Sequence, residues 1–202
     1  MMTNSETRIT IGLDLGKLRN HTALSVLERT YYRASTEEFI QSGTRGFQGE
    51  YRYMVIGADR LSLGTPYPRV ASWVKSVAKE YEANLGSIVV DASGVGTAVM
   101  DLLNRAELPV RPTGVVITGT QASPESGGGR TAVGYKTVSR TELLTKLQVA
   151  IQEKRFRIDA QRCREWDALR KELSLLRLEG KRAGVQDDLA FALALALWAG
   201  LR

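Results

Sequence analysis

The hydrophobic periodicity of this chain changes once, and this change is the strongest constraint on its fold. Residues 8–15, 22–32 and 51–63 alternate in polarity or are rich in β-branched and aromatic side chains, a pattern typical of strands. From Tyr67 to Ala83, apolar residues instead recur at i, i+3, i+4, i+7 and i+11, which predicts a helix. Because the first three strands lie close together in the sequence, we expect them to form an antiparallel meander.

Strands and helices alternate in the remainder of the chain. The segments 87–91 and 111–118 are predicted strands with a helical pattern between them. Three helices follow, and the last one begins at Asp187 and Asp188. The order β-β-β-α-β-α-β-α-α-α predicts an α/β fold: a five-stranded mixed sheet, with three antiparallel strands plus two parallel ones, and helices on both faces. We expect residues 1–202 to form this single domain.

The small number of cysteines and histidines excludes several kinds of site. The single Cys163 rules out a disulfide framework and zinc sites with several thiolates, and the single His21 rules out sites with several imidazoles. The longest apolar segment, from Leu189 to Leu201, is too short to span a bilayer. The N-terminus has no apolar signal region. We therefore expect a cytoplasmic protein without membrane association.

Positive charge is concentrated in one part of the chain. Residues 130–182 hold 14 of the 28 Lys and Arg residues but 7 of the 22 acidic residues, so this segment carries +7 and the rest of the chain −1. Twenty of the 28 are arginines, whose planar guanidinium suits phosphate oxygens. Either this charge covers a solvated surface, or it binds a polyanion such as double-stranded DNA. The DNA-binding candidates lie at the end of a glycine-rich loop and around the helix that follows it: Arg130, Lys136, Arg140, Arg155 and Arg157.

Aspartates occupy three places where a carboxylate is costly to bury. Asp14 and Asp91 each end an apolar strand, and Asp187 and Asp188 precede the most apolar helix. Each has a purely local interpretation, a turn for the strand aspartates and a helix cap for the pair. If the first and fourth strands are neighbours, however, the last helix could bring its N-terminus over their ends. The carboxylates would then converge.

Converging carboxylates without a His or Cys cluster are typical of Mg²⁺ or Mn²⁺ binding, because these hard ions prefer oxygen ligands. One or two such ions stabilise the attacking and leaving oxygens of a phosphodiester displacement. Asp14, Asp91, Asp187 and Asp188 are therefore the candidate catalytic and metal-binding residues. His21, in the loop after Asp14, is a candidate accessory residue that would protonate the leaving group or position water, unless it makes only a local hydrogen bond.

Several segments resemble known nucleases. The segment IGLDLGKLRNHTALSVLE resembles the first strand, loop and second strand of RNase H-like nucleases. The segment IVVDASGVGTAVMDLL resembles the fourth strand and following helix of the nuclease domain of phage large terminase subunits. The segment QDDLAFALALALW resembles that family's closing signature, and VSRTELLTKLQVAIQEKRFRI resembles the helix before it. Together the segments follow the family's order along nearly the whole chain.

The resemblance implies an RNase H-like fold and a Mg²⁺- or Mn²⁺-dependent endonuclease that cuts concatemeric phage DNA during genome packaging. Asp14 and Asp91 would be the two strand ligands, and Asp187 or Asp188 the third, with a preference for Asp188. A packaging ATPase domain, the portal and the small terminase subunit would be the partners, in the host cytoplasm. The chain has no P-loop of its own, so we expect it to be an excised nuclease domain or a stand-alone relative.

Other interpretations remain open at this stage. A RuvC-type Holliday-junction resolvase, or another RNase H-like nuclease outside packaging, would share the fold and the carboxylates, and the resolvase would act as a dimer on branched DNA. An actin-like or sugar-kinase-like ATPase half would bind phosphates through GLDLG and DASGVG, but 202 residues are too few for both domains of that fold. A non-catalytic DNA-binding or assembly module would not need intact aspartates at all three places.

Overall fold

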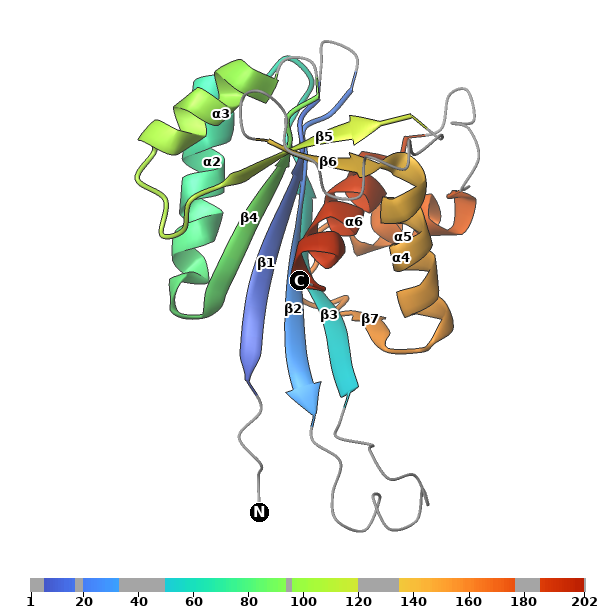
Figure 1. Ribbon diagram of the computed structural model, residues 1–202. Helices are drawn as coiled ribbons and strands as arrows, with labels where there is room; N and C mark the ends of the chain where they lie inside the picture. The colour runs from blue at the N-terminus through green and yellow to red at the C-terminus, as the bar shows by residue number, and fades with distance from the viewer. Residues whose placement is uncertain are drawn as a thin grey trace, which may run out of the picture.

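The structure is a computed structural model that describes residues 6–16, 20–32, 50–93, 96–119, 135–176 and 186–201. Seven strands in these segments form one sheet in the order β6-β5-β4-β1-β2-β3-β7 (Figure 1). The strands are β1 (Thr7–Asp14), β2 (Ala23–Tyr32), β3 (Glu50–Arg60), β4 (Leu85–Asp91), β5 (Thr113–Thr118), β6 (Lys136–Ser139) and β7 (Phe156–Ile158). The helices are α2 (Tyr67–Glu80), the short 3-10 helix η1 (Glu82–Asn84), α3 (Gly96–Arg105), α4 (Arg140–Gln152), α5 (Trp166–Leu175) and α6 (Asp188–Gly200).

The sheet is mixed, as the sequence predicts. Strands β1, β2 and β3 form the antiparallel meander, while β4 pairs with β1 in parallel and β5 pairs with β4 in parallel. The fold class and the five predicted strands are therefore confirmed.

The number of strands is higher than predicted. Strands β6 and β7 extend the sheet at its two edges, where β6 pairs in parallel with β5 and β7 in parallel with β3. They have four and three residues, too few to produce a period in the sequence. Main-chain pairing with a longer neighbour defines both strands, and such pairing leaves no local sequence signal.

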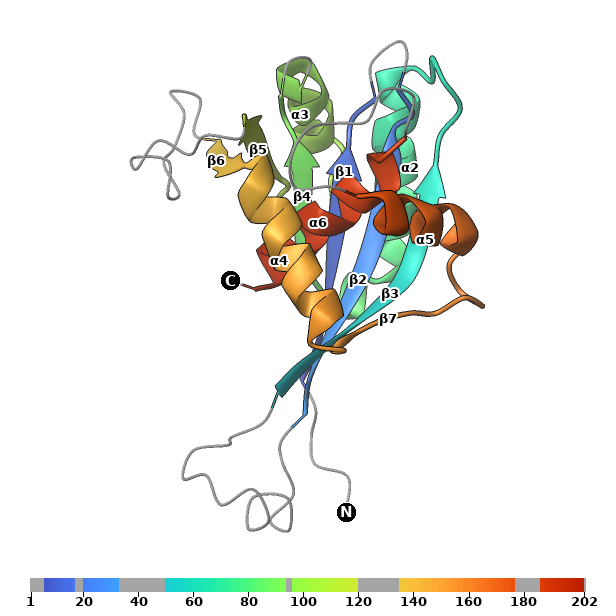
Figure 2. The same ribbon diagram turned by 90° about the vertical axis from the view of Figure 1, so that its right-hand side faces the viewer.

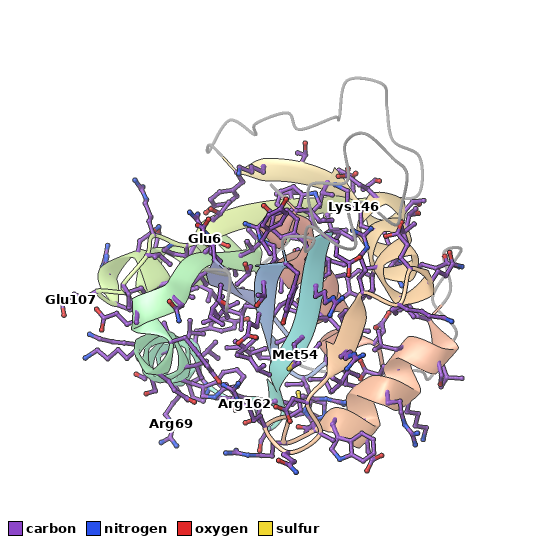
Figure 3. The ribbon with its side chains drawn as sticks, turned by 90° about the horizontal axis from the view of Figure 1, so that it is seen from below. Glu6, Met54, Arg69, Glu107, Lys146 and Arg162 are labelled. Carbon is purple, nitrogen blue, oxygen red and sulfur yellow. The ribbon has the colours of Figure 1, made fainter. Side chains whose placement is uncertain are left out.

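Helices cover both faces of the sheet (Figures 1 and 2). Helices α2 and α3 pack on one face, over a core that contains Ile11 and Val90. Helices α4, α5 and α6 pack on the other, over a core that contains Ala23, Val89 and Val115 and is called the α6-side core below. The view from below in Figure 3 shows the two groups of helices on opposite sides of the strands. None of the helices in the described segments is long and apolar enough to cross a membrane.

Helix α6 lies directly on the sheet because β1 carries a glycine at the crossing point. A Cβ added to Gly12 would overlap the carbonyl oxygen of Ala192 and lie 2.7 Å from the amide nitrogen of Ala196. Near the start of the helix, the Ser25 hydroxyl of β2 donates to the Leu189 carbonyl at 3.2 Å. This close packing brings the N-terminus of α6 to the end of the sheet at which β1 stops.

Candidate active site

Asp14 and Asp91 end two neighbouring strands. The β1–β4 pairing runs in parallel up to Leu13 and Val90, and the next residue on each strand is an aspartate. Side chains alternate between the two faces of a strand. Since Gly12 packs against α6 and Val89 lies in the α6-side core, both aspartates belong to the α6 face. The predicted adjacency of these two strand ends is confirmed, and this region is called the carboxylate end of the sheet below.

The pairing register continues from these aspartates in both directions across the sheet. Asp91 pairs with Val115 of β5, which pairs with Lys136 of β6, while Asp14 pairs with Ala23 of β2, which pairs with Arg60 of β3. In sheet order the row is Lys136, Val115, Asp91, Asp14, Ala23 and Arg60. The two carboxylates thus lie in the middle of this row, and a basic residue stands at each end of it, one strand beyond the apolar neighbours Val115 and Ala23.

The start of α6 brings the second pair of acids to the same face. Asp187 is the N-cap residue and Asp188 the first residue of the helix, and both are buried. In the described part of the chain, the Asp187 side chain makes no capping hydrogen bond to its own helix. Its Oδ2 instead accepts a hydrogen bond of 3.1 Å from Arg140. The helix-cap interpretation of Asp187 is therefore wrong, and its carboxylate is directed by a residue of another helix.

Arg140 owes its position to the start of α4. Ser139 is the N-cap residue of this helix, and its hydroxyl accepts a hydrogen bond of 3.0 Å from the Glu142 amide. The Arg140 guanidinium also lies over the Phe191 ring of α6, 4.1 Å from its centroid. Arg140 therefore contacts both the acid before α6 and the first turn of that helix.

Asp91 also has the local role expected of an aspartate before a turn. Its Oδ1 accepts a hydrogen bond of 2.8 Å from the Ser93 amide, and the Ser93 hydroxyl accepts one of 2.9 Å from the Ile117 amide. These contacts tie the end of β4 to β5 and fix the direction of the Asp91 carboxylate. The turn interpretation is confirmed for Asp91, and it does not displace the side chain from the α6 face.

The donor chemistry at the carboxylate end suits a hard divalent cation, because the candidate ligands are carboxylate oxygens. Asp14 and Asp91 lie next to each other on the face covered by α6, which itself begins with two acids. A divalent cation would stabilise carboxylates placed together in this way. Within the described segments, however, no group of three or more His, Cys, Asp and Glu side chains is close enough together to hold a metal ion. The structure thus brings Asp14 and Asp91 to adjacent positions but does not assemble the complete predicted ligand set.

His21 lies at the same end of the sheet, two residues before Ala23, which pairs with Asp14. Its Nδ1 is 2.9 Å from the carbonyl oxygen of Leu61. Since a carbonyl only accepts, Nδ1 carries the proton in this contact. The local hydrogen bond that the sequence allowed is therefore present, and an accessory role in catalysis stays a prediction.

The five predicted DNA-binding residues do not form a single surface. Lys136 is in the row of the aspartates, 5.8 Å from the Trp198 ring centroid, and Arg140 is paired with Asp187. Arg155 and Arg157 flank Phe156 of β7, which pairs with Tyr53 in the half of β3 remote from the carboxylate end. There Arg155 forms an ion pair with Glu153. Arg130 lies outside the described residues.

A partly buried network of charged and polar side chains lies beside the start of α6, and it is not among the features predicted from the sequence. Arg60, whose side chain is 11% exposed, forms ion pairs with Glu172 at 2.9 Å and Glu165 at 3.3 Å, and donates to Gln186 at 2.9 Å. These four residues line a hollow of about 400 Å³. One signal was available, because Glu172 is three residues after Leu169 on the apolar face of its helix.

Glu172 is the most unusual residue of this network. It is 5% exposed, and its Oε2 accepts a hydrogen bond of 2.9 Å from the Ala190 amide in the first turn of α6. Burial raises the pKa of its carboxyl, against the opposing influence of the Ala190 N–H and of Arg60, while Asp188 and Asp187 raise it further. Glu172 therefore shares the electrostatic environment of the two acids that begin α6.

Comparison with known proteins gives structural neighbours only. The sequence matches no family model and no curated protein sequence. The structure is similar to the large terminase nuclease of thermophilic phage G20c, with a TM-score of 0.55 and 16% identity over 95% of this chain and 81% of that one. It is also similar to the manganese-soaked terminase nuclease domain of human cytomegalovirus, with a TM-score of 0.57 and 8% identity over 94% and 81% of the two chains.

A third neighbour points to the same fold. The nuclease domain of the large terminase g2p from bacteriophage SPP1, with bound manganese, matches with a TM-score of 0.52 and 15% identity over 96% of this chain and 86% of that one. The chain therefore has the RNase H-like fold of terminase nuclease domains, which the resemblance in its sequence predicts.

Proposed function

We propose that this protein is a Mg²⁺- or Mn²⁺-dependent DNA endonuclease that hydrolyses phosphodiester bonds. The single observation that carries the proposal is the position of Asp14 and Asp91, which end adjacent parallel strands on the face covered by α6. A nuclease fold around this pair, with two buried acids at the start of α6, supports phosphodiester chemistry over the other uses of a carboxylate pair.

Asp14 and Asp91 would hold the metal, together with Asp188 or Asp187 from α6. When bound, the ion supplies Lewis acidity that polarises a phosphoryl oxygen and lowers the pKa of attacking water. The cytomegalovirus nuclease domain was soaked with manganese and the phage SPP1 domain has manganese bound, which supports a divalent ion of this type. Since Arg140 engages Asp187, we assign the direct contact to Asp188.

Other residues of the chain hold the carboxylates in place and position the substrate. The pairing of β1 with β4 holds the Asp14 and Asp91 carboxylates at a fixed separation, and the hydrogen bond from the Ser93 amide orients the Asp91 carboxylate. Lys136, two strands from Asp91 in the same row, would contact a backbone phosphate of DNA. Phosphate contacts of this kind position the duplex without reading its sequence. Binding should therefore be largely indifferent to DNA sequence.

We assign the enzyme to the cutting of concatemeric viral DNA during packaging, on the basis of its fold. The structural neighbours from phage G20c, cytomegalovirus and phage SPP1 are all terminase nucleases. A packaging ATPase domain, the portal and the small terminase subunit are the partners that this role requires, and the host cytoplasm is its location. A RuvC-type junction resolvase shares the carboxylate chemistry, and the choice of substrate separates the two.

The test is incubation of the purified protein with supercoiled plasmid in Mn²⁺, in Mg²⁺ and in EDTA. The proposal predicts nicked and linear products with either metal and none with EDTA. Equal cleavage in EDTA, or no cleavage with any divalent ion, contradicts it. A parallel incubation with a four-way junction and a linear duplex of the same sequence tests the packaging role, which predicts no preference for the junction.

A further inference from the structure

The first turn of α6 is capped by a residue from another helix. Asp187 directs its carboxylate to Arg140 instead of capping its own helix, while the Ala190 amide at the third helical position donates to Glu172 of α5 at 2.9 Å. An exposed N-terminal turn has free amides that a local Ser, Thr, Asp or Asn ordinarily satisfies. Here the acceptor is 5% exposed, so the turn is held from inside the protein.

Glu172 is itself held by Arg60 at the end of β3. The Arg60 guanidinium forms ion pairs with Glu172 within α5 and with Glu165 at the start of α5, and it donates a hydrogen bond to Gln186 immediately before the acid pair. A planar guanidinium fixes several oxygens at once with little freedom. Arg60 lies in the same row of the sheet as Asp14 and Asp91. It therefore connects this row both to α5, which caps the first turn of α6, and to Gln186, which precedes α6.

We propose that Arg60 and Glu172 are positioning residues for the active site, which set the place of Asp188 relative to Asp14 and Asp91. This inference rests on the proposed function and adds two residues to it. Neither side chain needs to touch metal or DNA. Arg60 acts through Glu172 and Gln186, and Glu172 acts through the Ala190 amide, so the pair holds the backbone on which Asp188 is carried.

The proposal predicts a defect in turnover with normal DNA binding. Displacement of a catalytic group by about 1 Å can cost roughly a hundredfold in rate. Arg60→Met should therefore lower kcat by roughly 10- to 100-fold, raise the Mn²⁺ concentration that gives half-maximal rate, and leave KM for DNA within about twofold. Arg60→Lys keeps the charge and should recover part of the loss. An unchanged kcat for Arg60→Met would overturn the proposal.

A matched control uses an exposed ion pair at the same strand end. Arg164 contacts Asp59, the residue before Arg60, at 3.0 Å, but its side chain is 81% exposed. Arg164→Met should leave kcat, KM and the Mn²⁺ requirement unchanged. If Arg164→Met has the same defect as Arg60→Met, then general loosening of the β3 end explains the result and the proposal is wrong.

Two further measurements separate this inference from the proposed function. Glu172→Gln keeps a carbonyl acceptor for Ala190 but loses the ion pair with Arg60. In that background Arg60→Met removes only the contacts to Gln186 and Glu165, so the defect of the double variant should be clearly smaller than the product of the two single defects. Fully multiplied defects would contradict action through Glu172. Amide exchange in residues 186–195 should be faster in Arg60→Met than in wild type and Arg164→Met. If Arg60→Met leaves the amide exchange of residues 186–195 unchanged, the positioning role is wrong. If the wild-type protein does not cleave DNA with Mn²⁺, the proposed function is wrong, even when Arg60→Met accelerates amide exchange in residues 186–195.

Discussion

The carboxylate of Asp187 accepts a hydrogen bond of 3.1 Å from Arg140, a residue 47 positions earlier in the chain. Both side chains are largely buried, with exposed fractions of 11% and 21%. The sequence assigns the arginine to DNA and the aspartate to metal binding or helix capping. Their pairing instead joins the start of α4 to the start of α6, and it neutralises one of the two acids beside the carboxylate end of the sheet.

Replacing Arg140 by methionine should therefore destabilise the protein. Asp187 would lose its partner while its carboxylate stays buried, at a cost of about 1–3 kcal/mol. The measurement is the free energy of unfolding from urea titration. Arg170→Met is the control, because Arg170 and Asp167 form a pair whose side chains are 72% and 70% exposed, and its removal should change stability by less than about 0.5 kcal/mol. Equal effects of the two substitutions on the free energy of unfolding would show that the buried pair stabilises the protein no more than the exposed pair does.

Gly12→Ala should be among the most destabilising single substitutions in the chain. The added methyl would overlap the backbone of α6 at Ala192, and a helix backbone cannot move aside as a flexible side chain can. We expect a loss of about 3 kcal/mol, the upper end of the usual cost of overpacking. Gly86→Ala is a matched change in β4, since its Cβ would have no neighbour nearer than 3.6 Å. Thermal unfolding of both variants checks this, and a stable Gly12→Ala would mean that α6 does not lie against β1.

The part of the fold that could be predicted is the part encoded by local pattern. The meander and the two parallel strands follow from hydrophobic period and connection length. The adjacency of Asp14 and Asp91 does not follow from either; it is the hypothesis under which the carboxylates converge, and the pairing of β1 with β4 confirms it. Strands β6 and β7 could not be found, because only pairing with a longer strand defines them.

A residue of the candidate site could be predicted only where its position in its own strand or helix was unusual for its type. Asp14 and Asp91 stand out because each ends an apolar strand. Arg60 and Glu172 do not, because their importance arises from contact between β3 and α5, which are distant in the sequence. For the same reason, the partner of Asp187 is visible only in three dimensions.

The salt dependence of DNA binding should identify which basic residues face the duplex. If DNA lies over the carboxylate end, Lys136→Gln should reduce the slope of log K against log salt concentration by about 0.9, the value for one phosphate contact. The double substitution of Arg155 and Arg157 by glutamine, at the remote half of β3, should leave the slope unchanged. Fluorescence anisotropy over a range of NaCl concentrations measures both. The opposite pattern would move the DNA to the β7 side.

The raised pKa of Glu172 predicts a specific dependence of stability on pH. Burial raises this pKa in the folded protein above 4.5, so the folded state holds the proton more tightly than the unfolded state. Stability from this group is fully present below pH 4.5 and is lost as pH rises through the folded pKa. Wild type should therefore gain stability relative to Glu172→Gln on acidification from pH 7, as measured by urea titration at each pH. A relative loss on acidification would contradict the assigned shift.

Plasmid cleavage by Asp14→Asn and Asp91→Asn in Mn²⁺ tests the central claim most directly. Each substitution keeps the size of the side chain and removes the charge that would hold the metal, so cleavage should be abolished. DNA binding should be retained or strengthened, because repulsion between carboxylate and phosphate is lost. Asp101→Asn, at an exposed position of α3, should cleave like wild type. Full Mn²⁺-dependent cleavage by either strand variant would show that the paired aspartates at the ends of β1 and β4 are not the metal ligands.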